Sequence, residues 1–213
     1  MAGGETAQLK SDQVHARQTF LRAVRTNGVD TIRQLLGQEG QEAIKLDDAG
    51  VLGETALMTA AQHGHVDIIK LLLTEGWSVS KKDKTGATAL LYAAKKDHAN
   101  AIETLIEANA SVNDQDNEGR SPLTWAARHG HVNAVKMLVQ HGAVVNYKDR
   151  RGPIPLIDAA DGGHANVVEA LIGKSSIEEK TKALSGAASS GHMEVVKEAL
   201  DTTASTLTKE HLY

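Results

Sequence analysis

Apolar and small residues recur along the chain at an interval of 33 residues. The clearest motif is a Leu followed three residues later by an Ala pair. It occurs in four successive copies, each 33 residues after the one before: Leu57 with Ala60-Ala61, Leu90 with Ala93-Ala94, Leu123 with Ala126-Ala127, and Leu156 with Ala159-Ala160. Repetition at this period indicates small structural units that stack on one another. The pattern therefore predicts a repeat protein and not a single globular core.

Residues 83–115 illustrate how one unit is expected to fold. The segment from Asp83 to Gly86 predicts a turn in which Gly86 has a positive φ, a conformation that costs other residues about 1–2 kcal/mol. Thr88 stands where a helix N-cap belongs, because its hydroxyl can accept a backbone N–H. A first helix is predicted over 89–96, with the Leu and the Ala pair on its packed side.

A second helix is predicted over 99–107, where apolar residues lie at i, i+3 and i+4 from Ile102. Asn109 follows it, and two sister units have Gly76 and Gly142 in the same place. Both residue types suit a left-handed helix C-cap. Each unit is therefore expected to be a pair of helices between turns.

The motifs of these units resemble the ankyrin repeat. The unit over 116–148 matches the family's Thr-Pro-Leu-His, Ala-Ala, Gly-His and Gly-Ala…Val-Asn elements most fully: Ser121-Pro122-Leu123-Thr124, Ala126-Ala127, Gly130-His131 and Gly142-Ala143-Val144-Val145-Asn146. The resemblance covers about residues 15–200 and implies an all-α repeat solenoid, an ankyrin-repeat stack of antiparallel helix pairs joined by β-hairpin-like turns. The family's His after Leu is replaced in four units, so we expect its hydrogen bonds to be partly missing: Met58, Leu91, Thr124 and Ile157.

The regular register is interrupted on both sides of the central block. The Ala-Ala position of the first repeat precedes the next one by 37 residues (23 to 60), which predicts a longer loop within 37–54. The Ala-Ala position of the last repeat follows that of the preceding repeat by only 28 residues (159 to 187), which predicts a shortened turn around Ser175-Ser176. We expect a flexible segment over 1–14, a C-terminal cap or tail over 201–213, and six repeats between them: approximately 15–49, 50–82, 83–115, 116–148, 149–176 and 177–200.

Composition narrows the class of protein without naming a partner. The net charge of −4 and the pI near 6.2 give no overall preference for nucleic acid. The absence of Cys excludes disulfides and thiolate metal sites. The N-terminus lacks the apolar run of a signal peptide, and the chain has no stretch of about 18 apolar residues. We therefore expect a cytoplasmic protein, with the nucleus as the alternative location, and no membrane partner.

No combination of residues predicts catalysis. The chain has no Gly-rich phosphate loop, Cys nucleophile or His-Glu-x-x-His motif, so we expect no enzyme activity, no cofactor and no metal. Asp158 and Asp161 could hold a cation but are interpreted as a solvated polar edge. Five recurring His residues are interpreted as loop imidazoles bonded to backbone, too far apart to share one metal ion: His65, His98, His131, His164 and His192.

Ankyrin-like stacks bind partners through their turn tips and the ends of their first helices. In this chain those positions carry a series of cations, here called the basic ladder: Lys82, Lys84, Lys95, Lys96, Arg120, Arg128, Lys148, Arg150 and Arg151. The predicted partner-binding residues are members of this ladder together with two aromatic residues and one His: Lys84, Tyr92, Lys95, Lys96, Arg120, Trp125, Arg128, His129, Arg150 and Arg151.

The aromatic residues leave two roles open. Tyr92 and Trp125 occupy the same position of consecutive repeats, where they either pack as half-buried residues or act as binding anchors, since Tyr and Trp dominate many interfaces. His63 and His129, at the ends of first helices, are alternatives for a pH-sensitive contact. Trp77 near a turn base has two alternative roles, a surface contact and packing against the next repeat.

These observations favour a non-catalytic scaffold or adaptor that acts through protein binding. The partner is expected on the concave face and the turn tips, and the basic ladder favours an acidic partner surface. We expect a monomer. Two alternatives remain: nucleic-acid binding through the basic ladder, with Tyr92 and Trp125 stacking on bases, and a recognition segment of a larger multidomain protein.

Overall fold

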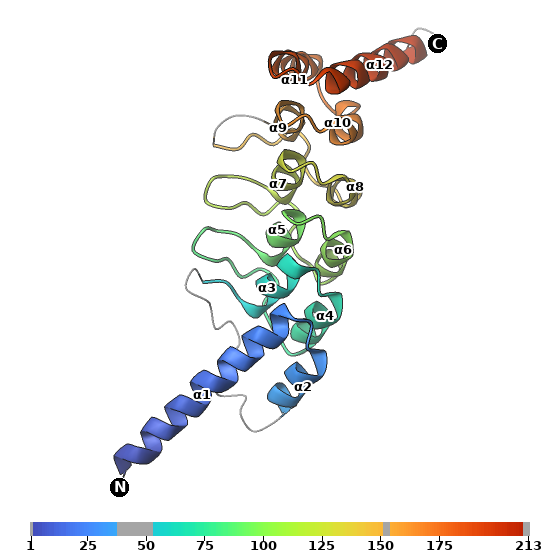
Figure 1. Cartoon of the computed structure of the whole chain (residues 1–213). Helices are drawn as coiled ribbons and strands as arrows, with labels where there is room; N and C mark the ends of the chain where they lie inside the picture. Colours follow the sequence, from blue (N-terminus) through green and yellow to red (C-terminus); the bar gives the residue numbers. More distant parts are fainter. Residues whose placement is uncertain (1, 38–52, 151–153, 211–213) are drawn as a thin grey trace.

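The computed structural model describes the backbone of residues 2–37, 53–150 and 154–210, and the side chains of 14–37, 53–150 and 154–202. In these segments twelve helices form six consecutive pairs that stack along one axis (Figure 1): α1 Ala2–Arg25 and α2 Val29–Gly37, α3 Ala56–His63 and α4 Val66–Thr74, α5 Ala89–Ala94 and α6 Ala99–Glu107, α7 Pro122–Arg128 and α8 Val132–Gln140, α9 Pro155–Asp161 and α10 Ala165–Ile172, and α11 Ile177–Ser189 and α12 Met193–Glu210. The predicted all-α repeat solenoid is confirmed.

The first and second helices of the repeats form two parallel columns. In Figure 1, α3, α5, α7, α9 and α11 make up one column and α4, α6, α8 and α10 the other. The turns between repeats project on the side of the first helices, away from the second ones. Turn residues and the exposed ends of first helices therefore share one surface.

Capping side chains set the starts of the first helices. The hydroxyls of Thr55, Thr88 and Ser121 each accept the backbone N–H three residues ahead, and Pro122 and Pro155 occupy the first helical position. The predicted N-cap at Thr88 is confirmed, and Thr55 and Ser121 cap their helices in the same way. The first helix predicted over 89–96 is shorter than expected, because α5 ends at Ala94 and a turn follows it.

Small side chains allow the columns to pack closely. The four recurring Leu residues and both members of every Ala pair between Ala60 and Ala160 are buried with no exposed surface. Where the family has His, Met58 Sδ accepts the N–H of Thr55 (3.3 Å), and Thr124 Oγ1 lies 3.0 Å from Ser121 Oγ. The expected loss of hydrogen bonds is therefore partly made up in these two repeats.

Hydrogen bonds also link each repeat to the next. The Nε2 of His98 donates to the carbonyl of Gln62 at 3.1 Å, and the other four recurring His residues donate in the same way to a carbonyl of the preceding repeat: His65 to Arg25, His131 to Lys95, His164 to Arg128 and His192 to Asp161. The interpretation of these imidazoles as backbone-bonded is confirmed. Burial lowers the pKa of His98, so this ring stays neutral at physiological pH.

The ends of the stack differ from its centre. A helix, α1, runs through the residues for which a flexible N-terminal segment was expected, and α12 continues to Glu210. The loop predicted within 37–54 lies mostly outside the described residues. The shortened turn around Ser175-Ser176 is confirmed: α10 ends at Ile172, and Ser176 and Glu179 form a capping box at the start of α11.

Trp77 is a packing residue. It is 4% exposed, and its ring stacks on Phe20 of α1 with centroids 5.8 Å apart. The prediction of local packing is correct, but this ring contact is with the preceding repeat and not with the following one. No described helix is both long and apolar enough to cross a membrane.

Candidate partner-binding surface

Tyr92 and Trp125 project from α5 and α7 toward the turns that precede their helices. Tyr92 Oη donates to Asp83 Oδ2 at 2.8 Å, and Trp125 Nε1 donates to Asp116 Oδ2 at 3.0 Å. Both rings are half-buried. One hydrogen bond at the edge of each ring therefore restrains its orientation toward the turn.

The aspartates that hold these rings are fully engaged by their own turns. Asp83 Oδ1 accepts the N–H of Thr85 (2.8 Å) and of Ala87 (2.9 Å), and Asp116 Oδ1 accepts two N–H groups of its turn in the same way. Burial acts to raise the pKa of Asp116, but hydrogen bonds from Arg120 and Trp125 outweigh it and hold this pKa below its usual value. Burial and the Asp83 carboxylate raise the pKa of Tyr92, so its hydroxyl remains a donor.

Two cations and an imidazole lie over the indole of Trp125. Lys95 Nζ is 4.3 Å and Arg120 Cζ 4.4 Å from the ring centroid, distances at which cation–π attraction operates. The ring of His129 stacks on the indole with centroids 5.2 Å apart, and His131 stacks on His129 in turn. Lys95, Arg120, Trp125 and His129, four of the residues expected to bind a partner, therefore lie together in space.

A cavity of about 270 Å³ opens between Tyr92 and Trp125, and we call it the ring pocket. Its walls come from the turns and first helices of two successive repeats: Thr85, Ala87, Leu91, Tyr92, Lys95, Asp116, Arg120 and Trp125. The cavity lies just below the range of about 300–1,000 Å³ that is typical of small-molecule pockets.

Internal ion pairs engage two predicted site residues. Arg120 Nε contacts Asp116 Oδ2 and Arg128 Nη2 contacts Asp158 Oδ1, both at 2.8 Å. The interpretation of Asp158 as a solvated polar edge is wrong, because this side chain is only 8% exposed and is paired with Arg128. Burial raises the pKa of Asp158, and Arg128 offsets this shift only in part.

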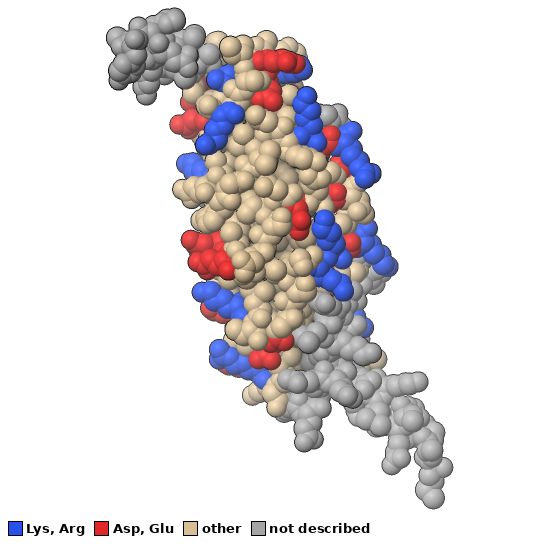
Figure 2. Space-filling model, turned by 180° about the vertical axis from the view of Figure 1, so that it is seen from behind, with Lys and Arg blue, Asp and Glu red and all other residues tan. Residues whose placement is uncertain are grey.

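Other predicted residues stay at the surface. Lys84, Lys96, His129 and Arg150 are exposed, and Arg151 lies outside the described residues. In the part of the chain that the structure describes, neither Lys95 nor Lys96 has an acidic partner within 4.0 Å. Figure 2 shows Lys and Arg along the edge that carries the turns, with Asp and Glu among them.

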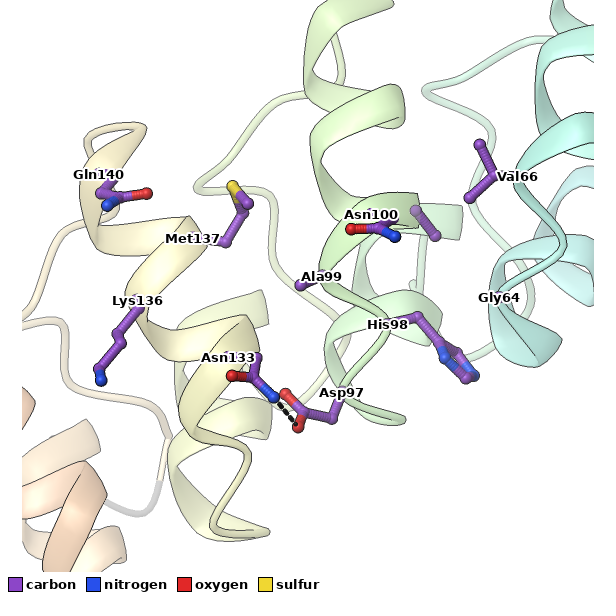
Figure 3. Close-up of a pocket in the computed structure, with 11 residues that line it drawn as sticks. Gly64, Val66, Asp97, His98, Ala99, Asn100, Asn133, Lys136, Met137 and Gln140 are labelled. Atoms are coloured by element: carbon purple, nitrogen blue, oxygen red, sulfur yellow. Dashed lines mark hydrogen bonds between the residues drawn. The ribbon is translucent and has the colours of Figure 1, made fainter.

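A second hollow lies among the second helices. This groove of about 530 Å³ draws its walls from three successive repeats (Figure 3): Gly64, Val66, Asp97, His98, Ala99, Asn100, Ala101, Asn133, Lys136, Met137 and Gln140. Ala99 stands where neighbouring repeats have Val66 and Val132, and the smaller side chain leaves space. The sequence interpretation missed this groove, although that replacement was visible in the register.

Comparison with known proteins identifies the family. A family model described as ankyrin repeats, in three copies, matches residues 20–116 and again 108–181, which together exceed half of the chain. The chain belongs to the ankyrin-repeat family. Proteins of this family are generally non-catalytic protein–protein interaction modules. No curated protein sequence matches the chain significantly.

This ankyrin-repeat protein departs from its own pattern at Asp97. The sister repeats have Gly64, Gly130 and Gly163 at this position, and Asp97 keeps the positive φ, at 58°. Its side chain compensates by capping a helix of the next repeat: Oδ1 accepts the N–H of Ala134 at 2.8 Å, in the first turn of α8. Figure 3 shows the accompanying bond from Asn133 Nδ2 to Oδ2, which is 3.1 Å long.

Removal of this cap is expected to destabilise the ankyrin-repeat stack. In Asp97→Ala the strained φ remains while the carboxylate is lost from the N-terminus of α8, so the free energy of unfolding should fall by about 1–2 kcal/mol. Asp97→Gly should cost less, because Gly relieves the backbone strain. Urea denaturation followed by circular dichroism tests both variants. Equal costs for Ala and Gly would contradict this account of the strain.

Proposed function

We propose that this ankyrin-repeat protein is a non-catalytic scaffold that binds an acidic partner protein on the surface shared by its turns and first helices. The observation that carries the proposal is the state of the charges around the ring pocket. Lys95 and Lys96 have no acidic partner in the described chain, whereas Asp83 and Asp116 are engaged by hydrogen bonds. This surface therefore offers positive charge to a partner.

Binding is expected to depend on Lys96. In a pull-down from cell extract, Lys96→Glu should weaken capture of the partner about tenfold, and added salt should weaken capture by the wild-type protein, because exposed charges steer association and are screened. Arg128 is unsuitable for this test, since its ion pair with Asp158 supports the fold.

Lys136→Glu is the matched control. Lys136 is an exposed lysine on α8 that lines the groove of Figure 3, on the column of second helices. The same charge reversal at this place should leave capture of the partner unchanged. A partner that is lost with Lys136→Glu and kept with Lys96→Glu would move the binding surface to the second helices and overturn the proposal.

Nucleic-acid binding is the weaker candidate for the same surface. A base that stacks on Trp125 would have to displace one of the groups that already contact the ring, namely Lys95, Arg120 or His129. Single-strand binders instead present open aromatic faces in a basic groove. The net charge of −4 also opposes approach to a polyanion.

A further inference from the structure

We propose that the ring pocket receives one large apolar side chain from an acidic segment of the partner, with a neighbouring carboxylate of that segment bound by Lys95. This inference rests on the proposed function and specifies the partner chemistry. The cavity lies between the rings of Tyr92 and Trp125, which are one repeat apart along the stack.

The walls of the ring pocket favour an apolar anchor. The half-buried rings of Tyr92 and Trp125 line the cavity together with Lys95 and Arg120, whose charged groups lie over the indole, and Leu91 and Ala87 add aliphatic surface. At about 270 Å³ the cavity has room for a Leu, Met or Phe side chain together with the start of its backbone. Burial of such a side chain is worth about 1.5–3 kcal/mol, which makes the ring pocket the natural centre of an interface.

The hydrogen bonds of the ring pocket disfavour a basic anchor. Asp116 lines the cavity and Asp83 holds the Tyr92 ring, and each accepts four hydrogen bonds from its own turn and the adjoining aromatic or Arg residue. A Lys or Arg of the partner would have to compete with these hydrogen bonds for either carboxylate. Lys95 Nζ, in contrast, lies over Trp125 with no acidic partner in the described chain and can donate to a carboxylate of the partner without leaving the ring.

The ring pocket is formed before the partner arrives. Each ring is tied to its turn by a hydrogen bond no longer than 3.0 Å, and the turns themselves are stacked, with Asn117 N–H donating to the carbonyl of Thr85 at 2.8 Å. A partner therefore loses little binding free energy to ordering of this surface. The conformational entropy lost on binding is therefore mainly that of the partner segment.

Selection from a random-peptide display library tests the inference. Peptides enriched on the wild-type protein should share a Leu, Met or Phe next to Asp or Glu. Binding of synthetic peptides is then measured by fluorescence of Trp125 in a Trp77→Phe background, which keeps the stack on Phe20. Lys95→Glu should weaken binding about tenfold and Tyr92→Ala about thirtyfold. Tyr92→Phe keeps the ring but loses the hydroxyl that ties it to Asp83, so it should bind more weakly than the parent and more tightly than Tyr92→Ala.

The outcomes separate this inference from the proposed function. Enrichment of basic or uncharged peptides, no enrichment, or binding that ignores both Lys95→Glu and Tyr92→Ala would overturn it. If a partner protein is lost with Lys96→Glu but retained with Lys95→Glu and Tyr92→Ala, the scaffold function stands and the ring pocket is not its anchor. Lys95→Glu changes only a partly exposed side chain, so the test holds even if Tyr92→Ala fails to fold.

Discussion

Replacement of Arg128 by Met is expected to lower the free energy of unfolding by about 2–3 kcal/mol at neutral pH. Removal of one partner from a buried ion pair costs about 3–5 kcal/mol, and the 26% exposure of the Arg128 side chain reduces this range. The penalty arises at Asp158, whose buried carboxylate loses the cation that contacts it at 2.8 Å. Guanidinium denaturation measured by circular dichroism gives the difference.

The penalty should depend on pH in a defined direction. Burial raises the pKa of Asp158 in the folded protein, and loss of Arg128 raises it further. Below the unfolded pKa of about 3.9, such a carboxyl group is protonated in both states and does not change the free energy of unfolding. As the pH rises from there through the folded pKa, the free energy of unfolding falls. The free energy of unfolding of Arg128→Met should therefore be close to that of the wild-type protein near pH 4 and lower than it at pH 7.

Asp158→Asn is the matched control. It removes the buried charge, and the partly exposed Arg128 can turn to solvent, so the cost should stay within about 1 kcal/mol. The double variant should be more stable than the sum of the two single effects predicts, because Arg128→Met is harmful only while Asp158 is ionised. A cost that is equal at both pH values, or equal for the two single variants, would show that Arg128 acts by packing alone.

The sequence was sufficient to predict the repeat and its local geometry. A period of 33 residues, hydroxyl N-caps and left-handed positions such as Gly86 and Asn109 all depend on neighbours along the chain. Such features are readable without a structure because each is decided within a few residues. The same holds for His98 and its sisters, whose register alone placed them at every helix break.

The pairing of side chains was harder to predict, although one signal was present. An aromatic donor stands nine residues after the turn Asp in two successive repeats, at Tyr92 and at Trp125. The next repeat has Asp158 at that position, where the turn residue Asp149 repels it and raises its pKa in addition to the effect of burial. Arg128 of the preceding repeat pairs with this carboxylate. The sequence pattern grouped Arg128 with the exposed cations, because the spacing within one repeat does not show that the next repeat supplies a buried carboxylate for Arg128.

Gly86→Ala is expected to destabilise the protein by about 2–4 kcal/mol, and Gly119→Ala by only about 1–2 kcal/mol. The two glycines occupy the same position of consecutive turns and both have φ of 80°. They differ in the space available to a Cβ atom. At Gly86 it would lie 2.8 Å from the backbone N of Asn117, whereas the nearest atom at Gly119 is the N of Arg150 at 3.3 Å.

The difference between the two variants isolates the stacking of turns from backbone strain. Strain at positive φ is common to both, so the additional cost of Gly86→Ala comes from displacement of Asn117, whose N–H and side chain donate to Thr85 and Lys84. Thermal and urea denaturation of the two variants measure this cost. If the two costs are equal, the turns are not held by these contacts. If Gly86→Ala is the more damaging, the fluorescence of Trp125 should change with it, because the Asp116 that holds its indole precedes Asn117 in the same turn.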